Sequence, residues 1–152
     1  MQFPKPSEYN EYYGRYIDLI DSAAIVSVLK ESNKEALAFY RSIPEEKWNK
    51  GYAPGKWTLK EALIHLIDSE QIFAYRALRI ARGDQTPLPG FEQDEYVPNS
   101  GANNRTVDSI LEEYEAMRKS TYLMFKNFEP AMWNRTGTAS GYPISVRALA
   151  FI

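Results

Sequence analysis

The chain has 152 residues, 44% of them apolar, which is enough for one domain with a substantial core and too few to suggest two. Eighteen basic residues against twenty acidic ones give a formal net charge of −2, so no broad cationic surface is available for nucleic acid. Cysteine is absent, which excludes disulfides, thiolate nucleophiles and cysteine-based zinc sites.

The N-terminus and the apolar runs bear on where the protein works. Residues 1–6 lack the apolar core of a signal peptide, and no apolar run approaches the roughly 20 residues that span a bilayer. We therefore expect a cytoplasmic protein without a membrane segment.

The first predicted elements are helices. Residues 4–20 combine two prolines with four tyrosines, and we expect a short helix there that packs on the outside of a bundle. Between about Ala23 and Ile43 apolar residues recur at helical spacing, and Pro44 begins a break. This pattern predicts the first long helix.

The second long helix is predicted over residues 59–82. Thr58 stands where an N-cap would, three residues before Glu61, which is the arrangement of a capping box. Gly83 ends the helix, and residues 86–101 are too rich in proline, glycine and asparagine to continue it. We interpret this long connection as either a functional loop or a packing strap.

The C-terminal third predicts two more helices and no strand. A third long helix opens at Thr106 and ends before Pro130, and a glycine-rich loop at 137–143 leads to residues 144–152, which begin a fourth. About eight residues cover only about 12 Å, so this fourth helix leaves part of a groove uncovered. The predicted fold class is all-α: a single domain built as a four-helix bundle, with a short N-terminal helix and a truncated fourth helix.

His65 is the only histidine, which excludes catalytic triads and paired-histidine metal motifs within these residues. It lies near the edge of the apolar face of its helix, and Asp68 is close enough along the helix to share a site with it. A hydrogen-bonded structural residue and a metal ligand both remain open for this histidine. The predicted apolar face consists of Leu59, Ala62, Leu63, Leu66, Phe73, Ala74 and Ala77.

Two ionic residues fall where apolar residues are expected. Glu70 lies in the middle of the apolar face of the second long helix, and Arg118 lies inside the apolar stripe of the third. An unpaired buried charge is costly, so a charge-assisted pair or a metal contact has to satisfy each. We predict that Glu70 and Arg118 meet as a buried ion pair, which either fixes helix register or serves a site.

Several blocks of the sequence resemble the DinB-like superfamily of four-helix-bundle metalloproteins. Residues 54–61, 65–70 and 73–79 resemble the signature of that family's second helix. Residues 86–91, 111–118 and 137–141 with 145–149 are similar to later blocks. In that family three histidines bind a divalent cation, zinc or nickel, and the first corresponds to His65. The other two belong to a segment of the fourth helix that this sequence lacks, so the resemblance implies an incomplete metal site. We expect the gene product to be longer, while a natural remnant remains the alternative.

The resemblance also implies a function for the complete protein. It is similar to thiol-dependent metalloenzymes such as bacillithiol transferases and mycothiol-dependent isomerases, in which a histidine-bound cation lowers the pKa of a coordinated thiol or water. The expected partners are a low-molecular-weight thiol and a small electrophile, with Arg76 or Arg118 binding an anionic substrate and Trp57 lining the pocket. A hydrolase-like reaction fits the same chemistry. The competing class is a non-enzymatic module in which a second copy covers the open apolar surface as a homodimer.

Overall fold

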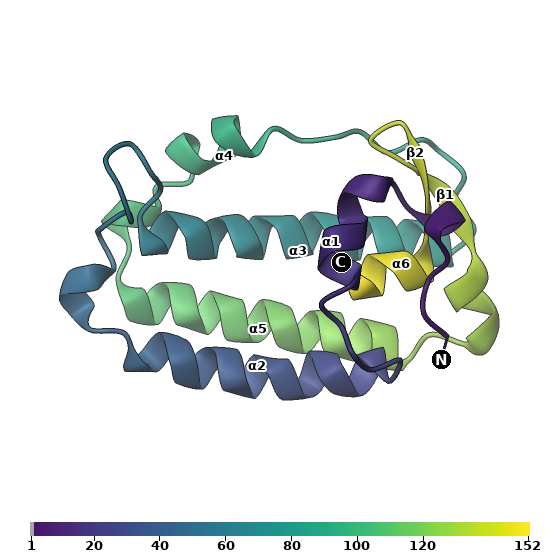
Figure 1. Cartoon of the computed structure of the whole chain (residues 1–152), viewed down its shortest axis with the longest axis horizontal. Helices are drawn as coiled ribbons and strands as arrows, with labels where there is room; N and C mark the ends of the chain where they lie inside the picture. Colours follow the sequence, from purple (N-terminus) through teal and green to yellow (C-terminus); the bar gives the residue numbers. More distant parts are fainter. Residues whose placement is uncertain (1) are drawn as a thin grey trace.

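Three long helices form the body of the molecule, and a computed structural model describes them together with the rest of residues 2–152. In Figure 1 the long helices α2, α3 and α5 lie side by side, and the short α6 lies against one end of α3. The helices are α1 (Gly14–Ile17), α2 (Ile25–Ser42), α3 (Leu59–Ala81), α4 (Gln93–Asn99), α5 (Val107–Lys126) and α6 (Val146–Phe151). The all-α prediction is therefore confirmed, with a short N-terminal helix and a six-residue last helix.

The helix starts follow from local side-chain chemistry. Thr58 Oγ1 accepts a hydrogen bond from the Glu61 amide (3.1 Å) and Glu61 Oε2 accepts one from the Thr58 amide (2.8 Å), so the predicted capping box is confirmed. The hydroxyl of Thr106 caps α5 in the same way, and that of Ser145 caps α6. Each cap satisfies a backbone amide that has no partner inside its helix.

The prediction of no strand is wrong. Two four-residue strands, β1 (Thr136–Ala139) and β2 (Tyr142–Ser145), pair antiparallel across a turn at Ser140 and Gly141. Both turn residues have positive φ, 52° and 83°, as a type I′ hairpin turn requires. Each strand is too short to show a period, and the glycine-rich composition predicted a loop, so only the backbone hydrogen bonds reveal the hairpin.

The long connection after α3 also differs from its prediction. Residues 93–99 form α4 although Pro98 lies within it, and α4 packs along α3. Pro98 stands in the last turn, so it removes one backbone hydrogen bond from a helix that ends one residue later. The connection is thus partly helical and covers one side of α3.

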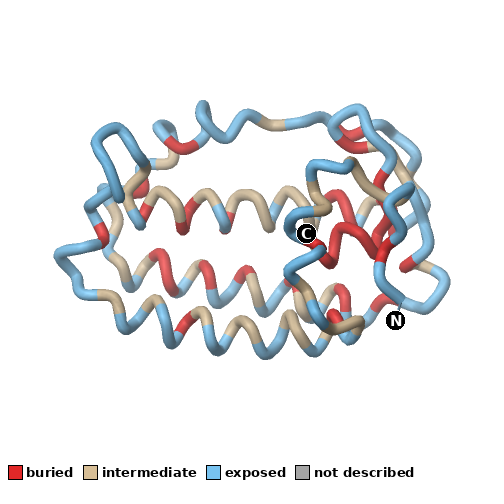
Figure 2. The backbone as a smooth tube through the Cα atoms, viewed as in Figure 1, coloured by how far each residue is buried: buried red, intermediate tan, exposed pale blue. Residues whose placement is uncertain are grey.

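The predicted apolar face of α3 was assigned at the wrong angle in its first half. Leu59 and Leu66 are 37% and 49% exposed, whereas Ile64 and Ile67 are 4% and 0% exposed. The reason is the position of the neighbouring helices: α3 packs on α5 through a cluster that contains Ile64 and Ile67, while the residues of α6 cluster with the far end of α3. Figure 2 shows the densest burial around α6.

A tether joins the N-terminal arm to α6. Glu8 forms an ion pair with Arg147, and the hydroxyl of Ser145 donates to Glu8 Oε2 at 2.8 Å. Both charged side chains are nearly enclosed, 13% and 10% exposed, so most solvent is excluded from the pair.

Within residues 2–152, no helix is long and apolar enough to cross a membrane.

Candidate metal-ligand site at His65

His65 lies on the first half of α3 and is partly covered by two neighbours. Its ring centroid lies 5.1 Å from that of Trp57, and its Nδ1 lies 3.4 Å from Ser69 Oγ, one helical turn further on. When Nδ1 carries the proton and donates to Ser69 Oγ, the lone pair of Nε2 remains available. A metal-bound histidine has this arrangement, in which a second group orients the ring through its other nitrogen.

The charge state of His65 follows from its surroundings. Burial lowers the pKa of His65 below its ordinary value, against an opposing effect from Asp68 and Asp94, which favour the protonated ring. Burial also raises the pKa of Asp68, with the negative charge of Glu113 acting in the same direction. At neutral pH the imidazole is therefore uncharged, which is the form that binds metal ions.

The residues around His65 do not complete a metal centre. Within residues 2–152 no group of three histidine, cysteine, aspartate or glutamate side chains is placed to hold a metal ion. A catalytic zinc centre needs about three protein ligands and an open position. His65 thus fits as one ligand, but the side chains that the structure describes do not fit a complete catalytic centre.

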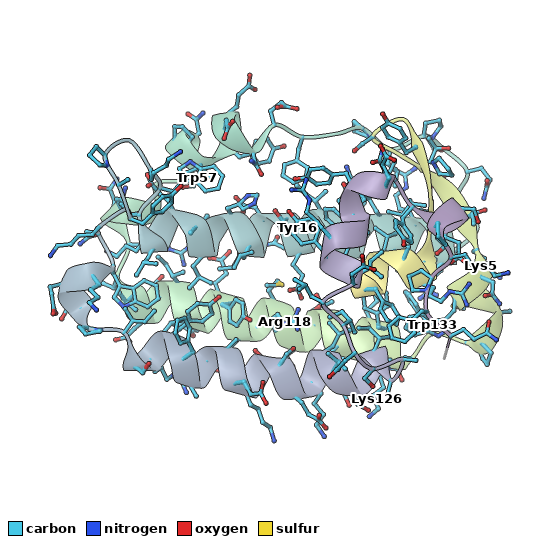
Figure 3. All side chains as sticks on the ribbon, in the orientation of Figure 1. Lys5, Tyr16, Trp57, Arg118, Lys126 and Trp133 are labelled. Atoms are coloured by element: carbon cyan, nitrogen blue, oxygen red, sulfur yellow. The ribbon has the colours of Figure 1, made fainter. Side chains whose placement is uncertain are left out.

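Trp57 is held over the histidine by a tight loop before α3. Gly51 and Thr58 form an isolated β-bridge, and a Cβ on Gly51 would lie against the Lys56 carbonyl and 3.0 Å from the Trp57 carbonyl oxygen. Any side chain at position 51 would therefore push this loop open. Asn103 braces the other side, since it bonds both members of the α3 capping box. Figure 3 shows Trp57 at the start of α3, on the side of α4.

The structure brings Glu70 and Arg118 together. Arg118 Nη1 donates to Glu70 Oε2 at 2.6 Å, and the side chains are only 14% and 18% exposed. Arg118 Nη2 also donates to the Leu29 carbonyl (3.3 Å) and to Ser32 Oγ (3.2 Å), so one guanidinium joins α2, α3 and α5. Two buried atoms of the pair, Glu70 Oε1 and Arg118 Nε, have no hydrogen-bond partner among the described residues.

The residues predicted to bind substrate do not converge on His65. Glu70 and its partner Arg118 lie about 140° around α3 from the histidine, at about 100° per residue. Arg76 lies eleven residues after His65 on α3, which is about 16 Å along the helix axis at 1.5 Å per residue. It is 2% exposed and donates to the Pro89 carbonyl (2.7 Å) and to Ser140 Oγ (3.0 Å). Of the three, only Trp57 lies beside the histidine.

Sequence reasoning missed the acidic neighbour from α4. Asp94 acts on the pKa of His65 from a segment that was interpreted as a loop, and nothing in the local sequence indicates that this segment folds back along α3. Ser140 was likewise interpreted as a loop residue without a role, although its hydroxyl contacts Arg76. In both cases the signal is tertiary.

Comparison with known proteins places this geometry in a family. The family model described as the DinB superfamily matches residues 29–152. A protein of Oceanobacillus iheyensis named "Putative metal-dependent hydrolase OB0413" is 30% identical over 70 residues, which cover 45% of this chain and 40% of that protein. The match therefore spans well under half the length of that curated relative.

A solved structure supports the fold. YfiT from Bacillus subtilis, described as "a probable metal-dependent hydrolase with an unusual four-helix bundle topology", superposes with a TM-score of 0.69. The superposition covers 97% of this chain and 81% of the other at 13% identity, so it shows a shared architecture. The predicted four-helix bundle is thereby confirmed.

Proposed function

The chain belongs to the DinB superfamily. On this basis we propose that the protein is a metal-dependent enzyme of the hydrolase class, in which His65 is one metal ligand. The observation that carries the proposal is the setting of His65: its ring packs on Trp57, and its Nδ1 lies 3.4 Å from Ser69 Oγ, which leaves Nε2 available when Nδ1 carries the proton. Burial also lowers its pKa, which favours the uncharged ring that binds metal ions. The names of the two relatives support the reaction class.

The surroundings of His65 favour a site with an apolar wall. Leu66, the next residue, is 49% exposed, and Trp57 covers one side of the imidazole. An apolar lining with a few polar groups is typical of small-molecule sites. The described residues supply one nitrogen ligand and no group of three ligands, so the proposal covers His65 as a single ligand of the centre. A divalent cation is the proposed cofactor, with zinc or nickel as the candidates.

The finer proposal concerns the reaction. A low-molecular-weight thiol and a small electrophile remain the proposed substrates, since the superfamily that residues 54–61, 65–70 and 73–79 resemble includes thiol-dependent metalloenzymes. Hydrolysis and thiol transfer differ in whether water or the thiol attacks. Product analysis with and without an added thiol separates the two.

Paramagnetic broadening tests the metal-ligand role directly. Co²⁺ added to the ¹⁵N-labelled chain is expected to broaden the amide signals around residues 57–69, because the ion sits at His65 Nε2. His65→Gln should abolish this local broadening. Lys119→Gln, on α5, serves as the control and should leave it unchanged. Equal broadening in the wild type and in His65→Gln would exclude the proposed ligand.

A non-enzymatic dimerising module is the second candidate, and one observation favours it. Leu59 and Leu66 stand seven residues apart on one face of α3 and are both substantially exposed. A second copy covering them would form a two-fold dimer. Sedimentation in the presence of a chelator distinguishes the candidates: a metal-free dimer that Leu66→Lys converts to a monomer supports the module, and a monomer at all concentrations excludes it.

A further inference from the structure

Arg76 differs from the other enclosed arginines of the molecule. Arg147 pairs with Glu8 and Arg118 pairs with Glu70, so each of those cations has a carboxylate partner. Arg76 is 2% exposed, yet no carboxylate within residues 2–152 lies at ion-pair distance from it. A buried charge without a counter-charge is unfavourable, so this position calls for a negative partner.

The contacts that Arg76 does make are neutral. Two of its hydrogen bonds come from Nη2, one to the Pro89 carbonyl and one to Ser140 Oγ. The rings of Phe73 and Phe91 lie 5.1 and 6.0 Å from the guanidinium carbon, a distance at which an aromatic ring attracts a cation weakly compared with a carboxylate. A side-chain hydrogen bond with the neutral phenol of Tyr13 also favours the charged form of Arg76.

A pocket of about 190 Å³ lies between the N-terminal arm and the β1–β2 hairpin. Arg76 does not line it, but one lining residue, Ser140, accepts a hydrogen bond from Arg76 and so stands between the cation and the pocket. At about 30 Å³ per water molecule it has room for about six waters, which suits a small ligand. Two of its lining residues reach Arg76: Ser140 accepts a hydrogen bond from it, and Tyr13 raises its pKa against the lowering effect of burial. The lining consists of Asn10, Tyr12, Tyr13, Ala139, Ser140, Tyr142, Pro143 and Ile144.

The chemistry of this lining is one-sided. It contains three tyrosine hydroxyls, a serine hydroxyl and a side-chain amide, all able to donate, and no acidic residue. Asn10 Oδ1 already accepts from the Tyr12 amide, which leaves its NH₂ group to donate. Ser140 Oγ accepts from Arg76, which leaves its own hydrogen for another acceptor. Donors that line a pocket in front of a cation without a carboxylate partner favour an anion as the ligand.

Ser140 is held in place at a conformational cost. Its φ of 52° lies in the left-handed region that favours glycine, and its amide donates to the Leu88 carbonyl at 3.0 Å. Glycine would adopt this turn with less strain, but only a side chain supplies the hydroxyl between Arg76 and the pocket. Residues held in such backbone conformations are frequent at binding sites.

We propose that this pocket binds a small oxyanion, a carboxylate or a phosphate, with Ser140 and the tyrosine hydroxyls as donors and with Arg76, one hydrogen bond behind Ser140, as the counter-charge. The site is separate from His65 and needs no metal ion. It lies at the opposite end of α3, where the hairpin and the N-terminal arm meet α6 (Figure 1).

NMR titration of the ¹⁵N-labelled chain in the presence of EDTA tests the proposal. Inorganic phosphate and sodium benzoate are added separately at constant ionic strength, with sodium chloride as the reference. We expect saturable shifts of the Ser140, Gly141 and Tyr13 amides, and the tighter of the two probes identifies phosphate or carboxylate as the ligand chemistry. Because EDTA removes metal ions, the result is independent of the role of His65.

Variants separate specific binding from general charge attraction. Ser140→Gly suits the positive φ and removes one hydroxyl, so it should weaken binding about tenfold, as expected for one hydrogen bond to a charged group. Arg76→Met should abolish binding, with folding checked by circular dichroism. Lys126→Met removes a positive charge on α5 and should leave affinity unchanged.

Two results would overturn the proposal. One is the absence of saturable shifts at Ser140 and Gly141 with both probes. The other is an unchanged affinity in Ser140→Gly, a variant whose folding does not depend on retaining the buried cation.

Discussion

The ion pair between α3 and α5 makes the sharpest prediction about stability. Arg118→Met leaves the carboxylate of Glu70, 18% exposed, without the cation that lies 2.6 Å from it. Glu70→Met leaves Arg118 with only neutral partners, the Leu29 carbonyl and Ser32 Oγ. Breaking an enclosed pair costs about 3 kcal/mol, whereas replacing both partners removes both buried charges. We therefore expect the double variant to lose less stability than the sum of the losses in the two single variants.

The expected magnitudes follow from the enclosure of the pair. We expect a loss of unfolding free energy of about 3 kcal/mol in Arg118→Met and about 2 kcal/mol in Glu70→Met. The double variant should lose about 2 kcal/mol less than the sum of these losses, and this difference is the coupling free energy. For a chain of this length, 3 kcal/mol corresponds to a Tm lower by about 6–12 °C. The exposed pair Arg41–Glu115, at 3.5 Å and more than half exposed on both sides, should couple by less than about 0.5 kcal/mol.

Urea unfolding of all seven proteins in the two double-mutant cycles, which share the wild type, measures these free energies. The m-value has to stay constant between variants, since a changed m-value indicates a changed unfolded state or lost two-state behaviour. Additive single effects at Glu70 and Arg118, or an equal coupling in the exposed pair, would refute the argument that enclosure makes the inner pair strong.

Three further predictions concern single residues. The imidazole of His65, the only histidine, should titrate below its ordinary pKa because burial disfavours the charged ring. The chemical shift of its C2–H proton, followed by ¹H NMR against pH, measures this pKa. A midpoint above about 6.5 would contradict the account. Burial acts to raise the pKa of Glu8, but hydrogen bonds from its partners outweigh it and the pKa is lowered. Its contribution is therefore present above about pH 4.3 and lost as pH falls through the lowered pKa, so urea unfolding of Glu8→Gln should show a weaker acid dependence than wild type. Gly137→Ala places a Cβ 2.8 Å from Ile80 Cγ1 and should lower the free energy of unfolding, measured by thermal unfolding, by about 1–3 kcal/mol. In the control Gly14→Ala the nearest atom to the new Cβ is 4.0 Å away, so the free energy of unfolding should not fall.

The sequence predicted the long helices well because their signals are local. The threonine at position 58 and the glutamate three residues later bond each other within one turn, and so the start of α3 can be located without knowing its neighbours. The pairing of Glu70 with Arg118 was also foreseeable. Each is an ionic group among apolar residues on its own helix, and the cost of leaving either alone predicts a partner.

The sequence was a poorer guide to which side of a helix is buried and to what surrounds it. Leu66 was assigned to the core and is 49% exposed, because α5 packs on a neighbouring face of α3 and α6 meets only its far end. The hairpin was missed because four-residue strands have too few positions to show a period.

The amino-acid order alone determined the number, type and starts of the long helices, the need for a buried ion pair, and the presence of a single imidazole. Only the tertiary structure decided that Asp94 lies near that imidazole, that Trp57 covers it, and that Arg76 is enclosed beside a pocket without a carboxylate partner. Caps and periodicity depend on residues within one or two turns, whereas burial and charge compensation depend on side chains brought together from distant parts of the chain. Local spacing does not encode those encounters.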